Sequence, residues 1–137
     1  MRFFRQRRDD DLANRQREVA DLFVDTAQRL AGVAFDYSEA SVGARDDWVD
    51  GLWDPNGPPP GEAELDSNTK LIGAYLGEVM IRHHGGAWKW NSDPEQPAIE
   101  TKGMTALVLN KAYKRQMNGP TDSLADFYAA FKRHNAT

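Results

Sequence analysis

Apolar side chains recur every three or four residues along much of this chain, and this period is typical of amphipathic helices. One such stripe predicts a helix from Asp11 to about Ala31. A second, shorter stripe predicts a helix over residues 39–53. The segment DPNGPPPG at 54–61 then predicts a loop within the domain, because its four prolines remove backbone donors.

A third helix is predicted from about Asp66 to His83, where the apolar positions form a broader face. Gly73 and Gly77 lie four residues apart in it, although each glycine costs a helix about 0.5–1 kcal/mol relative to alanine. The simplest explanation is the close approach of another backbone. One version of that explanation is a homodimer that packs through Gly73 and Gly77.

The apolar period then changes to two, as expected for β-strands. Strands are predicted at 87–91, 98–102 and 104–107. A polar loop at 92–97 and a tight turn at Gly103 join them. Because both connections are too short for a parallel crossover, we expect an antiparallel meander.

The helical period returns over 109–117 and again over 124–133, with a break at Asn118-Gly119-Pro120. The chain is therefore predicted to be an α+β protein with about five helices around a small three-stranded antiparallel meander. Its length of 137 residues suits one domain. We expect a flexible N-terminus over 1–10 and a single α+β domain over 11–134.

Composition and charge exclude several classes of function. The chain has no cysteine, so thiolate metal sites, disulfides and cysteine nucleophiles are excluded. The formal net charge is −4, and this acidic balance argues against a nucleic-acid partner. The sequence implies no cofactor.

No apolar run approaches the roughly 20 residues that a membrane-spanning helix needs. The first residues, MRFFRQRRDDD, have no apolar stretch behind their arginines, so they do not predict a secretory signal. We therefore expect a cytoplasmic protein.

Three segments resemble an uncharacterised bacterial domain family that is commonest in actinobacteria. They are FDYSEAS at 35–41, GAYLGEVMIRHHGGAW at 73–88 and KAYKRQMNG…DSLADFY at 111–128. The resemblance covers about 35–131 and implies a bacterial origin. It implies no activity and no catalytic residue.

Glu78 and His84 are the first candidate binding residues, since Glu78 lies near the apolar face of its helix and a carboxylate there needs a partner. That partner can be structural, or Glu78 can be an acid–base or ligand-binding group. A metal site is not predicted, because Glu78 and His83 are five residues apart and the two histidines are adjacent. Helical metal ligands need spacings of three or four residues to point the same way.

Trp88, Lys89 and Trp90 are the remaining candidates. Alternation on a strand places both tryptophans on one face and Lys89 on the other. Such a face either covers a core or, on an edge strand, forms a recognition patch.

The chain contains no nucleophile-elbow, phosphate-loop or dinucleotide-binding motif. We therefore predict a small cytosolic, non-enzymatic interaction module with a protein partner, of an accessory or immunity type. The alternative is a small-molecule-binding or hydrolytic domain with a site near Glu78 and His84.

Overall fold

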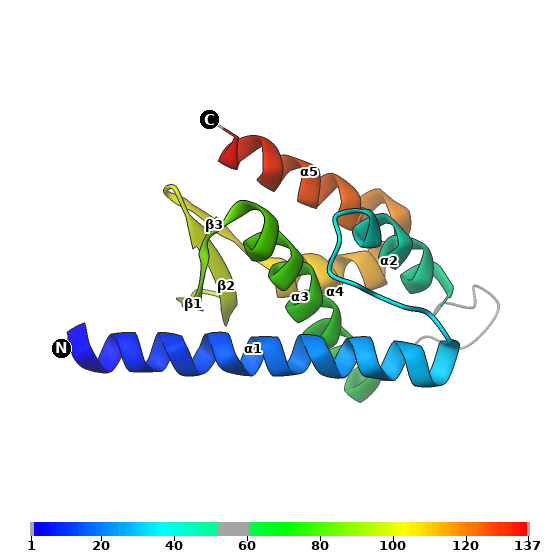
Figure 1. Ribbon diagram of the computed structural model, residues 1–137. Helices are drawn as coiled ribbons and strands as arrows, with labels where there is room; N and C mark the ends of the chain where they lie inside the picture. The colour runs from blue at the N-terminus through cyan, green and yellow to red at the C-terminus, as the bar shows by residue number, and fades with distance from the viewer. Residues whose placement is uncertain (1, 52–60, 137) are drawn as a thin grey trace.

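The computed structural model describes residues 2–51 and 61–136 (Figure 1). Within these residues the chain forms five α-helices, one short 3-10 helix and one three-stranded sheet, so the predicted α+β class is confirmed. In chain order the elements are α1 (Arg2–Ala31), α2 (Ala40–Gly51), α3 (Glu62–His84), β1 (Ala87–Ser92), β2 (Glu95–Thr101), β3 (Met104–Ala106), α4 (Val108–Asn118), η1 (Gly119–Asp122) and α5 (Leu124–Asn135).

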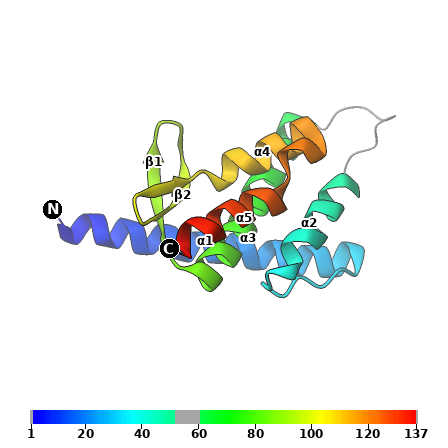
Figure 2. The same cartoon turned by 90° about the horizontal axis from the view of Figure 1, so that it is seen from above.

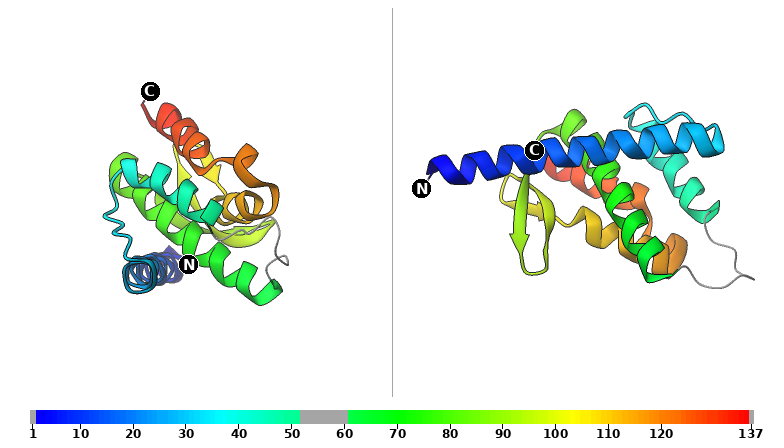
Figure 3. Two further views of the ribbon diagram at one scale, coloured as in Figure 1. Left: turned by 90° about the vertical axis from the view of Figure 1, so that its right-hand side faces the viewer. Right: turned by 90° about the horizontal axis from the view of Figure 1, so that it is seen from below.

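α3 occupies the centre of the fold and contacts α1, α4 and α5. α1 extends along one side of the molecule, and the sheet lies beside its N-terminal part (Figures 1 and 2). α2 packs against α5 on the other side of α3. Figure 3 shows α1 end-on in its left panel, with α3 crossing it. The sheet therefore meets the helices near one end of the molecule.

The core is built around α3, and Tyr75 is its largest fully buried side chain. The ring of Tyr75 lies 5.3 Å from that of Phe23 in α1 and 5.5 Å from that of Phe35, measured between centroids. Its hydroxyl lies 2.6 Å from the Ser41 hydroxyl in α2. One residue thus ties three helices and the loop between two of them together.

The sheet has the order β1-β2-β3 with both pairs antiparallel, which confirms the predicted meander. The polar loop predicted over 92–97 is wrong, because the turn occupies only Asp93–Pro94, joined by a cis peptide bond, and β2 begins at Glu95. Pro97 therefore lies inside a strand. It is tolerated there because β3 pairs only with residues 99–101, which leaves no β3 residue opposite Pro97.

The predicted start of the first helix at Asp11 is also wrong, since α1 begins at Arg2, inside the segment expected to be flexible. The apolar stripe does not continue before Asp11, so the pattern alone gave no helix there. The segment is rich in arginine, however, and arginine has a high helix propensity. In addition, Lys89 of β1 donates a hydrogen bond to Asp9 at 2.8 Å. This contact joins the third turn of α1 to the sheet.

The remaining helix boundaries lie close to those predicted. α3 begins at Glu62 rather than Asp66, and the two acidic residues of its first turn suit the positive end of the helix dipole. Ser123 caps α5 by accepting a hydrogen bond from the Asp126 amide at 3.2 Å. The predicted helix end at Trp53 and the loop over 54–60 lie outside the described residues.

The two glycines of α3 face elements of the same chain. A Cβ atom on Gly77 would lie 2.3 Å from the Trp88 ring, and one on Gly73 would lie 2.8 Å from Leu109 of α4. The predicted close approach of another backbone is present at Gly73, where the Leu109 Cα of α4 would lie 3.1 Å from the added atom. At Gly77 the close neighbour is the Trp88 side chain of β1 instead. Residues of the same chain therefore cover the glycine face, and the homodimer expected through Gly73 and Gly77 stays a prediction.

Candidate functional site

Glu78 is buried, with 4% of its surface exposed, and both of its carboxylate oxygens are paired. The indole N–H of Trp88 donates to Oε2 at 2.9 Å, and the guanidinium of Arg82 donates to Oε1 at 3.3 Å. Gly77 makes the first contact possible, because only a residue without a side chain leaves room for the Trp88 ring beside α3. The partner that a buried carboxylate requires is thus found within the chain.

Arg82 extends the Glu78 contact to the surface. Its guanidinium lies 3.6 Å from the ring centroid of Tyr37, a cation–π geometry. The Tyr37 hydroxyl donates to Asp21 of α1. Burial, together with this hydrogen bond to a carboxylate, raises the pKa of Tyr37. The chain of contacts from Trp88 to Asp21 joins β1, α3 and α1.

His84 belongs to a different cluster, which also contains Glu39, Tyr128 and Lys132. Oε2 of Glu39 accepts a hydrogen bond from the Tyr128 hydroxyl at 2.8 Å and lies 3.2 Å from both His84 Nε2 and Lys132 Nζ. Hydrogen bonds from Tyr128, Lys132 and His84 lower the pKa of Glu39 to about 2. Burial and the bond to Glu39 raise the pKa of Tyr128.

Glu78 and His84 are not brought into one site. They are six residues apart on α3, which corresponds to about 9 Å along the axis and about 120° around it. Their partners differ as well, since Glu78 meets Trp88 and Arg82 whereas His84 meets Glu39 and Tyr128. Both clusters join elements of the fold.

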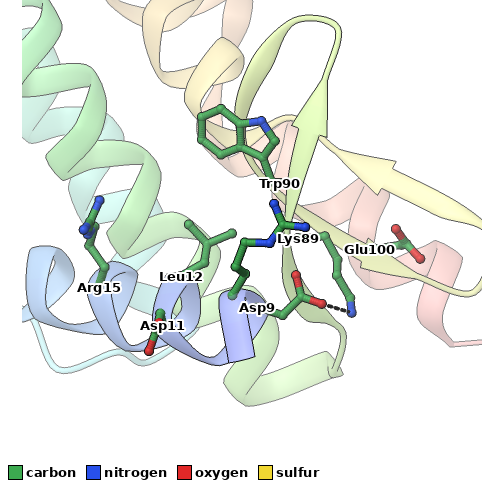
Figure 4. A pocket seen from close by; sticks show the side chains of 8 residues that line it. Asp9, Asp11, Leu12, Arg15, Lys89, Trp90 and Glu100 are labelled. Atoms are coloured by element: carbon green, nitrogen blue, oxygen red, sulfur yellow. Dashed lines mark hydrogen bonds and ion pairs between the residues drawn. The ribbon is translucent and has the colours of Figure 1, made fainter. Parts of the chain in front are cut away.

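The other candidate residues, Trp88, Lys89 and Trp90, differ sharply in exposure although they are adjacent. Trp88 is 3% exposed and packs on α3, whereas Trp90 is 58% exposed. Lys89 points to α1, where it pairs with Asp9 (Figure 4). The tryptophan face therefore covers the core at one position and presents an indole to solvent at the next.

Trp90 and Lys89 line a groove of about 700 Å³ between the N-terminal part of α1 and the sheet (Figure 4). We call it the α1–β1 groove. Its other lining residues are Arg8, Asp9, Asp11, Leu12, Arg15 and Glu100.

The α1 wall of this groove is a stripe of Arg8, Leu12 and Arg15, because spacings of four and three residues place side chains on one helix face. The two arginines are about 10 Å apart along the axis, at 1.5 Å per residue. Among the described residues neither of them forms an ion pair, in contrast to Lys89, which is neutralised by Asp9. Within the described part of the chain, the stripe therefore offers two guanidinium groups without an ion pair, one on each side of an apolar residue.

Sequence reasoning named the strand side of this groove and missed the helix side. The spacing of Arg8, Leu12 and Arg15 was visible, but these residues bracket the predicted start of the helix. Nothing in the sequence showed that this part of α1 lies beside β1. Glu39 and Tyr128 were missed for a similar reason, since 89 residues separate them in the chain.

In the part of the chain that the structure describes, no three His, Cys, Asp or Glu side chains are grouped in a way that could hold a metal ion. None of the described helices is both long enough and apolar enough to cross a membrane.

The chain was compared with protein-family models, with curated proteins and with solved structures, and nothing matches it in any of the three. The resemblance to an actinobacterial domain family stays a prediction.

Proposed function

We propose that this protein is a non-enzymatic interaction module whose α1–β1 groove binds an extended, acidic segment of a partner protein. The observation that carries the proposal is Trp90, a large aromatic side chain that is 58% exposed at the edge of the sheet and lines the groove. Exposed tryptophans beside a groove are frequent anchors of protein interfaces. The proposal keeps the cytosolic location, the bacterial origin and the accessory or immunity-type role expected from the sequence.

The geometry of β1 supports an extended partner. In an antiparallel pair, hydrogen-bonded and non-hydrogen-bonded residue pairs alternate. Pro97 is opposite Trp90 and has no amide hydrogen, so the hydrogen-bonded pairs with β2 are those of Lys89 and Asn91. The amide and carbonyl groups of Trp88 and Trp90 consequently point to the outer edge, where a further strand can pair with them.

The charge of the groove supports an acidic partner. Arg8 and Arg15 flank Leu12 on the α1 wall and are unpaired among the described residues. A segment that carries one or two carboxylates beside an apolar residue would complement this stripe, because charge-assisted hydrogen bonds to guanidinium are strong. Asp11 and Glu100 at the margin would disfavour a segment of uniform negative charge.

The test compares Trp90→Ala with a matched control, Tyr113→Ala, which removes another exposed aromatic side chain (45% exposed) from α4. The immobilised wild-type protein captures partners from the source cells, and the captured protein is purified and titrated by calorimetry. We expect Trp90→Ala to weaken binding about 30-fold, as for a typical interface anchor, and Tyr113→Ala to leave it unchanged.

Hydrogen exchange checks the mode of binding. In the free protein the amides of Trp88 and Trp90 should exchange faster than those of Lys89 and Asn91, and in the complex the Trp90 amide should become protected. The proposal is wrong if the Trp90→Ala variant binds the partner as tightly as the wild-type protein does. It is also wrong if binding protects the amides of a surface other than α1 and β1.

A further inference from the structure

A second hollow lies on another part of the molecule, between β3, α4 and α5, and shares no residue with the α1–β1 groove. Its volume is about 390 Å³, which falls in the range of roughly 300–1,000 Å³ typical of small-molecule sites. The proposed protein-binding role does not use it. We call it the α4–α5 hollow.

The walls of the α4–α5 hollow are mainly apolar. Met104 is the first residue of β3, and Leu107 immediately precedes α4. Phe127 and Phe131 lie on successive turns of α5. Phe131 is part of the buried core, whereas Met104, Leu107 and Phe127 are only partly buried. The hollow thus reaches from solvent to the core and can receive an apolar body.

Two ammonium groups and one carboxylate complete the lining. Lys111 Nζ lies 3.2 Å from Asp122 Oδ1 and 5.9 Å from the ring centroid of Phe127. Asp122 also accepts a hydrogen bond from the side-chain amide of Asn118 at 2.8 Å. The hydrogen bond from Asn118 has the largest effect in lowering the pKa of Asp122, and the hydrogen bond from Lys111 lowers this pKa further. Asp122 is therefore ionised at neutral pH and neutralises Lys111.

Lys114 is the unbalanced charge of the hollow. It lies one turn after Lys111 on the same face of α4, and among the described residues it forms no ion pair. The lining therefore carries a net positive charge beside an apolar interior. A ligand with a cationic head would meet two ammonium groups. A single anionic head would meet Lys114, which forms no ion pair among the described residues and interacts with Asp122 through its charge at longer range.

We propose that the α4–α5 hollow binds a small amphipathic acid, with its apolar body against Phe127 and Met104 and its anionic head at Lys114. The class includes short fatty acids and arylalkanoic acids, which share one carboxylate and an apolar body. Lys114 fixes the orientation by charge, and the aromatic wall supplies most of the contact area.

The probe is octanoate, titrated into the whole chain and followed by nuclear magnetic resonance of backbone amides and of the Met104 methyl group. Octylammonium and octanol are the comparison probes, because they carry the same tail with a positive and a neutral head. We expect octanoate to bind about fivefold more tightly than octanol, the size of one exposed ion pair, and octylammonium to bind more weakly than either.

Three variants locate the site. Lys114→Gln should lower octanoate affinity about fivefold and leave octanol affinity unchanged. Lys70→Gln removes an exposed lysine of α3 outside the hollow and should change neither the octanoate affinity nor the octanol affinity. Ala130 is an exposed residue of α5 that lines the hollow. Ala130→Trp should fill the hollow and abolish the binding of both octanoate and octanol.

Equal binding of octanoate and octylammonium to the wild-type chain would overturn the proposal. An unchanged octanoate affinity in Lys114→Gln would overturn it as well, and so would octanoate binding that perturbs residues of the α1–β1 groove rather than Met104.

Discussion

Glu78 and Glu39 are both paired carboxylates, but their surroundings differ. Glu78 is enclosed by α3 and β1 and holds the indole N–H of Trp88, which is also buried. Glu39 is 40% exposed along its side chain and gathers Tyr128, Lys132 and His84 at the surface. A buried pair contributes stability that is lost when one partner is removed, because the other partner is left buried without a hydrogen bond. An exposed cluster contributes stability that is lost mainly when its charged group is titrated.

Removal of the Glu78 carboxylate should destabilise the fold through Trp88. Glu78→Ala leaves the buried indole N–H without an acceptor, and we expect the free energy of unfolding to fall by about 2 kcal/mol. Glu78→Gln keeps an amide oxygen for the indole and should cost about 1 kcal/mol or less. Urea denaturation measures both, and equal losses for the two variants would contradict this role of Glu78.

Titration of Glu39 should make the stability of the protein sensitive to acid. Because the folded-state pKa is about 2 and the ordinary value is 4.5, the carboxylate form is favoured by folding. That stabilisation is complete above about pH 4.5 and is lost as the pH falls toward 2. Urea denaturation from about pH 5 to about pH 2.5 measures this loss. The difference in the free energy of unfolding between wild type and Glu39→Gln should shrink steadily, and a constant difference would contradict the stabilising role of the Glu39 carboxylate.

At the level of the element, the glycines of the helices have opposite roles. Gly77 of α3 faces the Trp88 ring, so that an added Cβ would lie 2.3 Å from a ring carbon. Gly43 of α2 is exposed, and an added Cβ would meet nothing within 4 Å. Glycine is intrinsically unfavourable at both positions, but only Gly77 is required by packing.

Substitution of these glycines by alanine should therefore change stability in opposite directions. Gly77→Ala should destabilise the protein by about 1–3 kcal/mol, because Trp88 must leave its place against α3. Gly43→Ala should stabilise it by about 0.5–1 kcal/mol through helix propensity. Thermal denaturation followed by circular dichroism compares them, and a rise in the Gly77→Ala midpoint would show that the ring moves without cost.

At the scale of the whole molecule, the N-terminal part of α1 is joined to the sheet by the pair of Lys89 and Asp9, whose charged atoms lie 2.8 Å apart. The side chains are 38% and 16% exposed, so the pair is partly screened by solvent. Both side chains line the α1–β1 groove (Figure 4). The shape of the groove thus depends on a contact between residues 80 positions apart.

A double-mutant cycle with Lys89→Gln and Asp9→Asn should give a coupling energy of about 0.5–1 kcal/mol at low salt and less at high salt. Amide exchange in α1 residues 9–13 should accelerate in either single variant, while exchange in the middle of α3 stays unchanged. Additive effects of the two substitutions would mean that α1 is held on the sheet by other contacts.

The sequence alone determined the kinds of element and their order. A period of 3.6 residues marked the helices, a period of two marked β1, and the short connections required antiparallel strands. These signals are local, because hydrophobic period and turn chemistry belong to neighbouring residues. Pro97 misled the strand assignment, since its tolerance depends on how far β3 extends.

Only the tertiary structure decided which of these residues are used and how. Trp88 and Trp90 have the same alternation on the same strand, yet the first packs against Gly77 and the second is 58% exposed. Trp88 could be assigned to Glu78 as a partner only once β1 lay against α3, and the groove beside Trp90 exists only because α1 lies next to β1. Burial and pairing are set by contacts between distant segments, and no local pattern in the chain encodes those distances.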